Sequence, residues 1–535
     1  MTDYPLASKS GAMQAGRIVV HPRGFGFVEL DNGVTAFIPP PDLLWFLKDD
    51  RVEAELVTAN DGRFNATNVR LVRRVREQVF GTITERKGRP HVRVDREISN
   101  ADWPIVGDAP AAGTHVVAAL EGNELRIVRV VEPADASLAR VIVRYAIRDE
   151  YAKDALAETP PPVTMDGRRD LRAIPTITID APSSRDLDDA LSVFPAAPDG
   201  AIRLLVSIAD VDALVPEGSA LDREARIRGT SVYLAGRVIP MLPPSLSEDA
   251  LSLLPSVDRP AMTAELRIDP EGRVHAIDVY ASMIRSHARL DYDGVAAFLD
   301  QGDTAGIPEP VRETLRWLRT AAARIAVTRH ARGGVSLLRE EAYITVDEIT
   351  REPTTIGART NTTAHTLVER LMVSANEAVA RWLVDRGLPG VFRVHDAPAS
   401  NKVDSLAAWA GNFGFAAGFG KELTPLGLAA FEEQFASTPI APAVSNVLGR
   451  ALGPARYTVH PSVHFGLAAP LYLHFTSPIR RYADLAVHRI VKAFLAGRRA
   501  LYARRTVPYC AKRCRGDSCV STRYRRRSES PGSVE

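Results

Sequence analysis

The sequence predicts a multidomain protein in which two N-terminal all-β barrels precede one large α+β domain. Three observations lead to this prediction. The chain has 535 residues, which is long enough for roughly three or four domains. Residues 14–73 and 77–133 each alternate apolar and polar side chains between Gly- and Asn-containing turns, as the short strands of small barrels do. After Pro133 strand-like runs alternate with helical runs, which indicates a mixed architecture.

The expected domain boundaries follow from these changes of pattern. The domains are a flexible N-terminus over 1–13, a first barrel over 14–73, a second barrel over 77–133, the α+β domain over 134–497 and a basic, disordered tail over 498–535. Within the α+β domain, the segment 365–380 carries apolar residues at helical spacing. The sequence therefore predicts an amphipathic helix in this segment, with its apolar stripe facing the core.

Composition is that of an ordinary globular protein. A hydrophobic content of 45% and a charged content of 25% exclude wholesale disorder, collagen and coiled coil. The sequence has no run of ~18 apolar residues, and its first residues lack the apolar core of a signal peptide. All three cysteines come late, at Cys510, Cys514 and Cys519, so no disulfide framework holds the fold. We expect a cytoplasmic monomer that does not bind membranes.

The net charge of +2 conceals an asymmetry along the chain. Residues 498–535 contain eleven Lys/Arg and three Asp/Glu, a balance of +8, which leaves −6 for residues 1–497. A near-neutral or acidic body is not typical of a nucleic-acid binder by bulk charge. Any site for a polyanion must therefore be local, and motifs must identify it.

The first barrel carries a cluster of aromatic residues. Phe25 and Phe27 are two residues apart, so on a strand both rings point to one face, and Phe37 lies on the next expected strand. Exposed aromatics beside basic residues form a stacking platform for single-stranded nucleic acid. From the pattern alone, an equally good interpretation is that these rings face the interior of the barrel. The strings GFGFV and FIP, however, resemble cold-shock domains, and this resemblance implies that all three phenylalanines contact RNA.

The strongest chemical signal is a cluster of four carboxylates within ten residues. Asp180 ends a strand-like run, and Asp186, Asp188 and Asp189 follow a Pro-Ser-Ser break. Apolar neighbours should bury this segment, and packing like charges together raises their pKa values unless a cation neutralises them. A hard divalent cation such as Mg²⁺ suits an all-oxygen cluster. The alternative is a solvated acidic loop that caps a helix beginning at Ala190.

The same cluster carries a family resemblance. Its D-x5-D-x-D-D spacing resembles the catalytic signature of the RNase II/RNase R (RNB) family of exoribonucleases. Five further segments resemble motifs of this family in the same order. They are RGTSVYL…DRPAMT (228–263), SHARLDYDGV (286–295), HTLVERLMVSANEAVA (365–380), FRVHDAPA (392–399) and LYLHFTSPIRRYADLAVHR (471–489). With the N-terminal barrels, the resemblance spans residues 14–495.

The resemblance implies roles for individual residues. The four aspartates fall on the catalytic aspartates of the family, which cleaves with two metal ions, and Asp188 is the least dispensable of them. Arg480 matches the arginine that grips the phosphate near the cut, for which a planar guanidinium is suited. Tyr233 matches the tyrosine that stacks on the terminal nucleotide. Tyr292 and Glu369 match positions tied to sugar recognition and to the choice of RNA over DNA.

Without the resemblance, these residues have simpler interpretations. Tyr233 and Tyr292 would then be expected in the core, and Arg480 in a surface ion pair, although Pro478 just before it indicates a fixed turn. The histidines of the α+β domain show no zinc-site spacing, and we expect them to be structural or hydrogen-bonding. They include His395, His464, His474 and His488.

The sequence also departs from the family pattern. Glu369-Arg370 stands where the family usually has two acids, and Ser207 where it often has histidine. The family continues into a third OB-type barrel, whereas only a short basic segment follows residue 497 here. The Cys-x3-Cys-x4-Cys spacing in that segment is a weak zinc signal, because no histidine is near it.

The function that the sequence predicts is a Mg²⁺-dependent 3′-to-5′ exoribonuclease. It would hydrolyse single-stranded RNA to nucleoside 5′-monophosphates by a two-metal mechanism. The alternative is a non-catalytic RNA-binding regulator of the RNB type, since some members of this family have lost their aspartates. The presence of all four aspartates and of Arg480 favours the enzyme. Six ordered motifs exclude an RNA chaperone with an unrelated appended domain.

Overall fold

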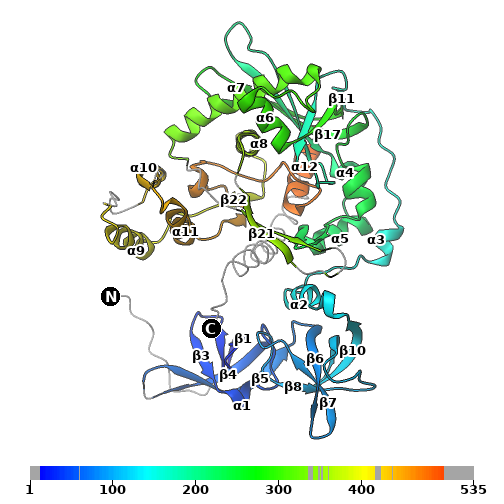
Figure 1. Ribbon diagram of the computed structural model, residues 1–535, viewed down its shortest axis with the longest axis vertical. Coiled ribbons are helices and arrows are strands. Elements are labelled where there is room, and N and C mark those ends of the chain that lie inside the picture. Colours follow the sequence, from blue (N-terminus) through cyan, green and yellow to red (C-terminus); the bar gives the residue numbers. More distant parts are fainter. Residues whose placement is uncertain are drawn as a thin grey trace. The chain divides into compact units, whose positions relative to one another are not determined.

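The computed structural model divides the chain into two compact units (Figure 1). The first contains residues 1–149 with 346–353, and the second contains 150–345 with 354–535. The structure describes residues 13–59, 61–334, 341–347, 350, 353–359, 361–415, 423–435 and 438–498. All but the first residue of the expected basic tail, with its three cysteines, and all but the last residue of the expected flexible N-terminus lie outside these ranges. Among the described helices, none is both long and apolar enough to cross a bilayer.

The first unit begins with a closed five-stranded barrel. Its elements are β1 (Gln14–Val20), β2 (Gly26–Leu30), β3 (Thr35–Ile38), α1 (Pro40–Leu43), β4 (Arg51–Thr58) and β5 (Phe64–Arg73). The strands follow the order β1-β2-β3-β5-β4, and only the β3–β5 pair is parallel. Ile18, Val28 and Ile38 are fully buried inside. A Cβ atom at Gly26 would lie 2.6 Å from the Val19 carbonyl oxygen, so this close strand approach requires glycine.

A second five-stranded sheet follows in the same unit. It consists of β6 (Gln78–Arg86), β7 (Arg89–Val94), β8 (Asp102–Pro104), β9 (His115–Glu121) and β10 (Glu124–Val131), in the order β10-β9-β6-β7-β8. A bridge between Ile105 and Leu125 joins its two ends, as in an OB-type barrel. The core contains Trp103, whose indole N–H donates to Ser99 Oγ at 3.0 Å. The two predicted all-β modules are therefore present.

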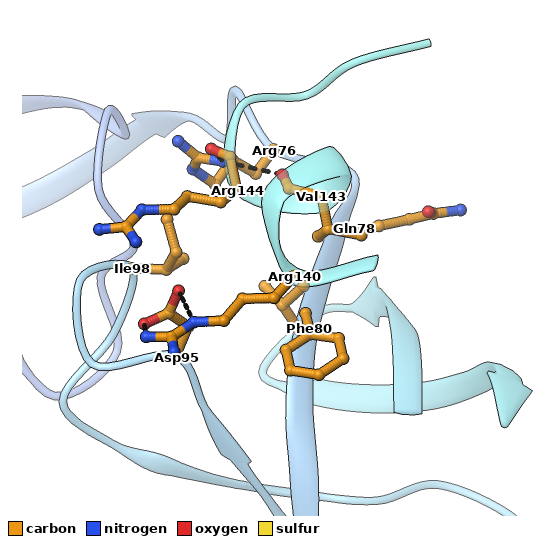
Figure 2. Close-up of a pocket in the computed structure, with 9 residues that line it drawn as sticks. Arg76, Gln78, Phe80, Asp95, Ile98, Arg140, Val143 and Arg144 are labelled. Atoms are coloured by element: carbon orange, nitrogen blue, oxygen red, sulfur yellow. Dashed lines mark hydrogen bonds and ion pairs between the residues drawn. The ribbon is translucent and has the colours of Figure 1, made fainter. Parts of the chain in front are cut away.

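A short helix is attached to this second sheet (Figure 2). After η1 (Pro133–Asp135), α2 (Ala136–Arg144) packs Ala139 against Phe80 and Val117. The guanidinium of Arg76 donates to the Arg144 carbonyl at 2.8 Å, which satisfies the C-terminal end of α2. Arg140 forms two hydrogen bonds with Asp95, at 2.8 and 3.0 Å. These contacts group α2 with the barrels, so the first compact unit extends to residue 149.

The second unit is built on one mixed sheet. Its strands are β11 (Arg169–Asp170), β12 (Ile177–Asp180), β13 (Asp189–Phe194), β14 (Ile202–Ala209), β17 (Asp258–Ile268), β18 (Val274–Arg285) and β19 (Ala288–Asp291). They follow the order β11-β18-β17-β14-β13-β12-β19, with parallel pairs at both edges and antiparallel pairs between them. The sheet and the helices packed on it share one large hydrophobic core. The predicted α+β architecture is confirmed.

The chain around this mixed sheet forms helices and two small hairpins. They are α3 (Lys153–Ala157), α4 (Val211–Leu214), α5 (Ala220–Arg228), β15 (Val232–Leu234), β16 (Arg237–Ile239), η2 (Ser245–Ala250), α6 (Tyr292–Gln301), α7 (Glu309–Ala331), β20 (Glu341–Val346), β21 (Pro353–Arg359), α8 (Thr363–Asp385) and α12 (Tyr482–Leu495). The helix predicted over 365–380 lies within α8. Its stripe of Leu367, Leu371, Ala375 and Val379 is buried, as the spacing predicted.

Three further helices form a separate core within the second unit (Figure 1). They are α9 (Ser400–Gly411), α10 (Pro425–Phe435) and α11 (Ala441–Leu452), followed by β23 (Arg456–Thr458), which pairs with β22 (Phe392–Val394), and by η3 (Phe465–Leu467). His395 joins this group to β22. The Gly466 N–H donates to His395 Nδ1 at 3.0 Å, so Nε2 carries the proton and donates to the Leu452 carbonyl at 2.9 Å. His395 therefore has the hydrogen-bonding role expected of it.

His464, which lies beside His395, should make stability depend on pH. Burial, then the neighbouring His395, Arg393 and Arg329, lowers the pKa of His464 to about 3. An imidazole in the unfolded chain titrates near ~6.5, so the stabilising contribution is complete above that pH and is lost as the pH falls toward the folded value. We expect a loss of about 1.4 kcal/mol per pH unit in this window from this residue.

Chemical denaturation at neutral and mildly acidic pH measures this effect. His464→Gln should flatten the decline of the unfolding free energy on acidification. The exposed His460 provides a matched control, because His460→Gln removes an imidazole from the same loop without removing a buried one. An acid slope that is the same in His464→Gln and in the unmodified chain would contradict the prediction.

Candidate active site

The sheet brings the two ends of the acidic cluster together. Asp180 is the last residue of β12 and Asp189 the first residue of β13, and these strands pair antiparallel at Ile177–Leu191. The chain between them is a loop that returns on itself and carries Asp186 and Asp188. Ala190 lies inside a strand, so the alternative in which the aspartates cap a helix at this residue is wrong.

Two distant side chains hold this loop. The Arg289 guanidinium donates to the carbonyl oxygens of Pro182 at 3.0 Å and Ser184 at 2.6 Å. The buried Ser252 hydroxyl donates to the Arg185 carbonyl at 2.7 Å and accepts from the Leu187 N–H at 3.1 Å. Because these bonds fix the backbone on both sides of Asp186, Arg289 and Ser252 are positioning residues for the cluster. The sequence does not reveal either role, since nothing local marks a serine or an arginine as the partner of a loop so far away along the chain.

Removing the Ser252 hydroxyl should disturb the loop more than the fold. In Ser252→Ala the Leu187 N–H and the Arg185 carbonyl lose their partner, at a cost of about 1–3 kcal/mol in stability. Asp186 and Asp188 then lose their fixed backbone, so we expect turnover on RNA to fall about tenfold or more beyond any loss of folded protein. Thermal unfolding and steady-state turnover, measured on the same preparations, separate the two effects.

Ser247→Ala is the matched control. Ser247 is also buried, and its hydroxyl donates to the Pro243 carbonyl at 3.3 Å rather than to the backbone of the acidic loop. This variant should lose stability without losing turnover per folded molecule. If the Ser252 and Ser247 variants lost turnover equally, the positioning role of Ser252 would be wrong.

Charges in the cluster are shielded from solvent and close to one another. Burial, and then the charge of Asp189, raises the pKa of Asp180 to about 8, against the opposing effects of Arg289 and Arg480. Burial raises the pKa of Asp189 to about 6 and that of Asp188 well above its ordinary value. Each of these carboxyl groups is therefore costly to ionise without a cation beside it.

Asp188 lies at the centre of the arrangement. It is 3% exposed, and its Oδ1 accepts from the Ile479 N–H at 2.9 Å. Its Oδ2 lies 3.4 Å from Arg480 Nε in an ion pair without a hydrogen bond. Oδ2 of Asp180 is likewise enclosed and has no hydrogen-bond partner. Two carboxylate oxygens are therefore shielded from solvent but still free to accept a ligand.

The two enclosed oxygens, Asp180 Oδ2 and Asp188 Oδ2, are candidates for binding a metal ion. Within the described ranges, no group of three or more His, Cys, Asp or Glu side chains is arranged to hold a metal ion. Asp186 instead accepts from the Tyr233 hydroxyl at 3.0 Å, and Asp188 pairs with Arg480. The unpartnered oxygens, the raised pKa values and the all-oxygen donor set nevertheless fit a hard divalent cation. The four-aspartate metal site is thus not assembled in this conformation and stays a prediction.

Arg480 is held by its backbone while its side chain remains accessible. Its carbonyl oxygen accepts from the Thr230 hydroxyl at 2.9 Å and from the Ser231 N–H at 3.0 Å. In the same turn the Ser477 N–H donates to Asp484 Oδ1 at 2.8 Å. The turn that Pro478 predicted is therefore fixed at both ends, and the half-exposed guanidinium projects beside Asp188. The surface ion pair expected from the sequence alone is instead a pair with a buried aspartate.

The two tyrosines differ in exposure. Tyr233 lies in the β15–β16 hairpin and is 48% exposed, so the expectation that it belongs to the core is wrong. Tyr292 is half-buried at the start of α6, and its ring stacks on His365 with centroids 3.8 Å apart. Burial, then the charges of Asp189 and Asp180, raises the pKa of the Tyr292 hydroxyl. Tyr292 is therefore next to the acidic cluster, and Tyr233 is bonded to it.

The remaining predicted residues lie on two other surfaces. Glu369 is exposed on α8, one turn after His365, and accepts from Arg329 Nη1 at 3.4 Å. In the first unit, Phe25, Phe27 and Phe37 form a cluster with ring centroids 5.7–6.0 Å apart, on the face opposite the barrel core. His21 stacks on Phe25 at 4.3 Å. The alternative in which these rings face inward is wrong, and the outer face carries an aromatic platform.

Comparisons with known proteins agree with this architecture. A family model described as RNB domain matches residues 168–497, and one described as Ribonuclease B OB domain matches residues 16–72. Ribonuclease R of Aquifex aeolicus is 32% identical over 504 residues, which cover 90% of this chain and 71% of that protein. Ribonuclease R of Escherichia coli is 36% identical over 396 residues, which cover 73% of this chain and 46% of that protein.

Solved structures give the same result. RNase R of Mycoplasma genitalium, in complex with ribose methylated single-stranded RNA, matches with a TM-score of 0.85 and 25% identity over 95% of this chain and 85% of that one. Yeast Ssd1, a pseudonuclease, matches with a TM-score of 0.73 at 18% identity, which shows the fold alone. The sheet, the N-terminal OB-type region and the matches over most of the chain lead to one assignment: this chain belongs to the RNB family that includes ribonuclease R.

Proposed function

We propose that this chain, a 3′-to-5′ exoribonuclease of the RNB family, hydrolyses single-stranded RNA to nucleoside 5′-monophosphates with Mg²⁺ as its cofactor. Asp180, Asp186, Asp188 and Asp189 would hold the metal. The observation that carries the proposal is the pair of enclosed oxygens, Asp180 Oδ2 and Asp188 Oδ2, that lack hydrogen-bond partners beside an accessible arginine. Divalent ions held by these four residues would supply the activation of water and the stabilisation of the leaving 3′ oxygen.

The protein's own side chains position the substrate. Arg480 has a half-exposed guanidinium on a fixed backbone, so its planar donors can bind the oxygens of a phosphate without reordering the turn. Tyr233 presents an exposed ring beside Asp186 on which a terminal base can stack. Tyr292 and Glu369 would contact the sugar and select RNA over DNA. The platform of Phe25, Phe27 and Phe37 would stack bases of the incoming strand.

Incubation with 5′-labelled poly(A) tests the proposal. With Mg²⁺ present, we expect a ladder of labelled fragments that shorten from the 3′ end, and nucleoside 5′-monophosphates on thin-layer chromatography. Chelation of the metal should stop the reaction and leave the RNA bound. A DNA strand of the same sequence should bind without being degraded. RNA that is bound but stays intact with Mg²⁺ or Mn²⁺ would instead support the non-catalytic regulator. The monomeric state and cytoplasmic location are part of the proposal, and light scattering and cell fractionation test them.

Two substitutions at Tyr233 separate its ring from its hydroxyl. Tyr233→Ala removes the stacking surface, worth ~1–3 kcal/mol per base, so short oligonucleotides should dissociate earlier and the final limit product should change length. Tyr233→Phe keeps the ring and loses only the bond to Asp186, so the limit product should stay the same. Denaturing gels of exhaustive digests measure both. An unchanged limit product in the alanine variant would show that the ring does not hold the end of the RNA.

A further inference from the structure

Three arginines of the second unit lie near one another with few acidic partners. They are Arg329 at the end of α7, Arg370 on α8 and Arg393 in β22, and we call them the arginine cluster. A buried arginine ordinarily has its donors paired, because leaving a charged group unpaired away from water is costly. Buried guanidinium groups whose N–H donors lack partners therefore indicate a site for an anion.

Arg329 is the most buried of the three. Its side chain is 9% exposed, and its Nε is enclosed without a hydrogen-bond partner. Its ion pair is a 3.4 Å contact of Nη1 with the exposed Glu369. The nearby Glu377 is engaged elsewhere, since it accepts two hydrogen bonds from Arg332, at 3.1 and 3.3 Å. Burial raises the pKa of Glu377 against the opposing charges of Arg332 and Arg329, so Arg329 and Glu377 attract each other, but the donors of Arg329 stay incompletely paired.

Arg370 increases the local excess of positive charge. It is half-buried, and in the described part of the chain its side chain forms no hydrogen bond and no ion pair. Burial, then the positive charge of Arg329, lowers the pKa of Arg370. A side chain held beside a like charge without a partner does not stabilise the folded protein by itself. The position of Arg370 beside Arg329 therefore needs an explanation other than stability.

Arg393 adds a third cation. Its Nη1 is enclosed and has no hydrogen-bond partner within the described ranges, while its guanidinium lies over the Tyr457 ring, 4.6 Å from the centroid. Nearby, His464 has an enclosed Nδ1 without a partner, and burial keeps the pKa of this imidazole at about 3. His464 is thus a neutral polar group among cations at ordinary pH.

The packing of the second unit brings these residues together. Helices α7 and α8 pack side by side, with Arg329 Nη1 reaching Glu369, the residue before Arg370. One turn further along α8, Val373 packs against Tyr472. The backbone N–H of Arg393 donates to the Tyr472 carbonyl at 2.9 Å, which brings β22 to the same place. Burial, and then the positive charges of Arg481, Arg393 and Arg480, lowers the pKa of His474.

We propose that the arginine cluster is a second phosphate-binding site, which takes a backbone phosphodiester of the RNA strand at a distance from the phosphate that Arg480 grips. The proposal rests on the proposed function for the identity of the strand. Glu369, the neighbour of Arg370 on α8, is exposed, and Arg370 itself is only half-buried, so a phosphate can reach Arg370 from this side. A phosphate bound to Arg370 would supply the acceptor that this side chain lacks, and its negative charge would offset the positive charges of Arg329 and Arg393 behind it.

The decisive variant is Arg370→Gln in the full chain. It is made in the Asp188→Asn background so that RNA stays intact, and binding of a fluorescent single-stranded oligoadenylate is followed over a salt series. We expect the affinity to fall about tenfold, as for one lost charge-assisted hydrogen bond. The slope of log affinity against log salt should fall by ~0.7, the value for one phosphate on a single strand. An oligodeoxyadenylate should lose affinity by the same factor, because the contact reads phosphate and not sugar.

Stability distinguishes this role from a structural one. Because Arg370 faces a like charge without a partner, Arg370→Gln should melt at the same temperature as its parent or higher. Arg381→Gln is the matched control, since Arg381 is an exposed arginine three turns further along α8 and loses the same charge. It should leave affinity and salt slope unchanged. A lower melting temperature in Arg370→Gln, or an affinity and salt slope equal to those of the parent, would overturn the proposal.

The outcome also separates this site from the proposed function. If the unsubstituted chain degrades RNA while Arg370→Gln binds as tightly as its parent, the phosphate site is wrong and the exoribonuclease stands. If the unsubstituted chain does not degrade RNA with any divalent metal but Arg370→Gln still weakens binding and lowers the salt slope, the phosphate site stands and the proposed function is wrong.

Discussion

Asp188→Asn is expected to lower turnover on single-stranded RNA by about three orders of magnitude while the chain stays folded. An asparagine keeps the shape of the side chain and a carbonyl oxygen that can still accept from the Ile479 N–H. It cannot carry the negative charge that a divalent cation requires. Single-turnover cleavage with saturating Mg²⁺ measures the loss, and RNA binding should persist or tighten, because a carboxylate no longer repels the phosphate.

The same variant should be more stable than its parent in the absence of metal. Burial raises the pKa of Asp188, which means that its ionised form is disfavoured in the folded chain, and asparagine removes that cost. Addition of Mg²⁺ should raise the melting temperature of the unsubstituted chain but not that of the variant. Asp385→Asn, at the exposed end of α8, is the control and should change neither property. Near-normal turnover in Asp188→Asn would show that this cluster is not catalytic.

Arg480→Lys is expected to lower turnover by about 10²–10³-fold with little change in stability. Lysine keeps the positive charge beside Asp188 but loses the planar set of donors that binds two phosphate oxygens at once. The loss should be larger in kcat than in KM, because the contact matters most as charge develops on the phosphate. Steady-state kinetics on a short oligoribonucleotide measure both constants.

The neighbouring Arg481 is a stringent control for Arg480. Arg481 donates to both oxygens of the fully buried Asp484, at 2.9 and 2.8 Å, whereas Arg480 only approaches Asp188 at 3.4 Å. Arg481→Lys should therefore lose about 1.5–3 kcal/mol in stability, because lysine keeps the charge but cannot make both hydrogen bonds to Asp484, with a smaller effect on turnover per folded molecule. If the two variants showed the same pattern, Arg480 would be a structural residue.

Local patterns in the sequence were sufficient for several features. The period of two in β2 places Val28 in the barrel core and Phe27 on the outer face, because alternate side chains of a strand point to opposite sides. The helical period of 365–380 predicts the buried stripe of α8. The spacing of the four aspartates identifies the acidic loop, since that signal lies within ten residues. Each of these depends only on neighbours along the chain.

Tertiary structure decided what these residues contact. Whether a helix or a strand follows Asp189 depends on pairing with β14, which the aspartates themselves do not encode. The contact of Asp188 with Ile479 joins residues 291 positions apart, and the bonds of Arg289 to the acidic loop span more than 100. The arginine cluster likewise forms only where α7, α8 and β22 converge. Charges and hydrogen bonds act through space over a few ångströms, so their partners follow from the register of the sheet and the packing of the helices rather than from distance along the sequence.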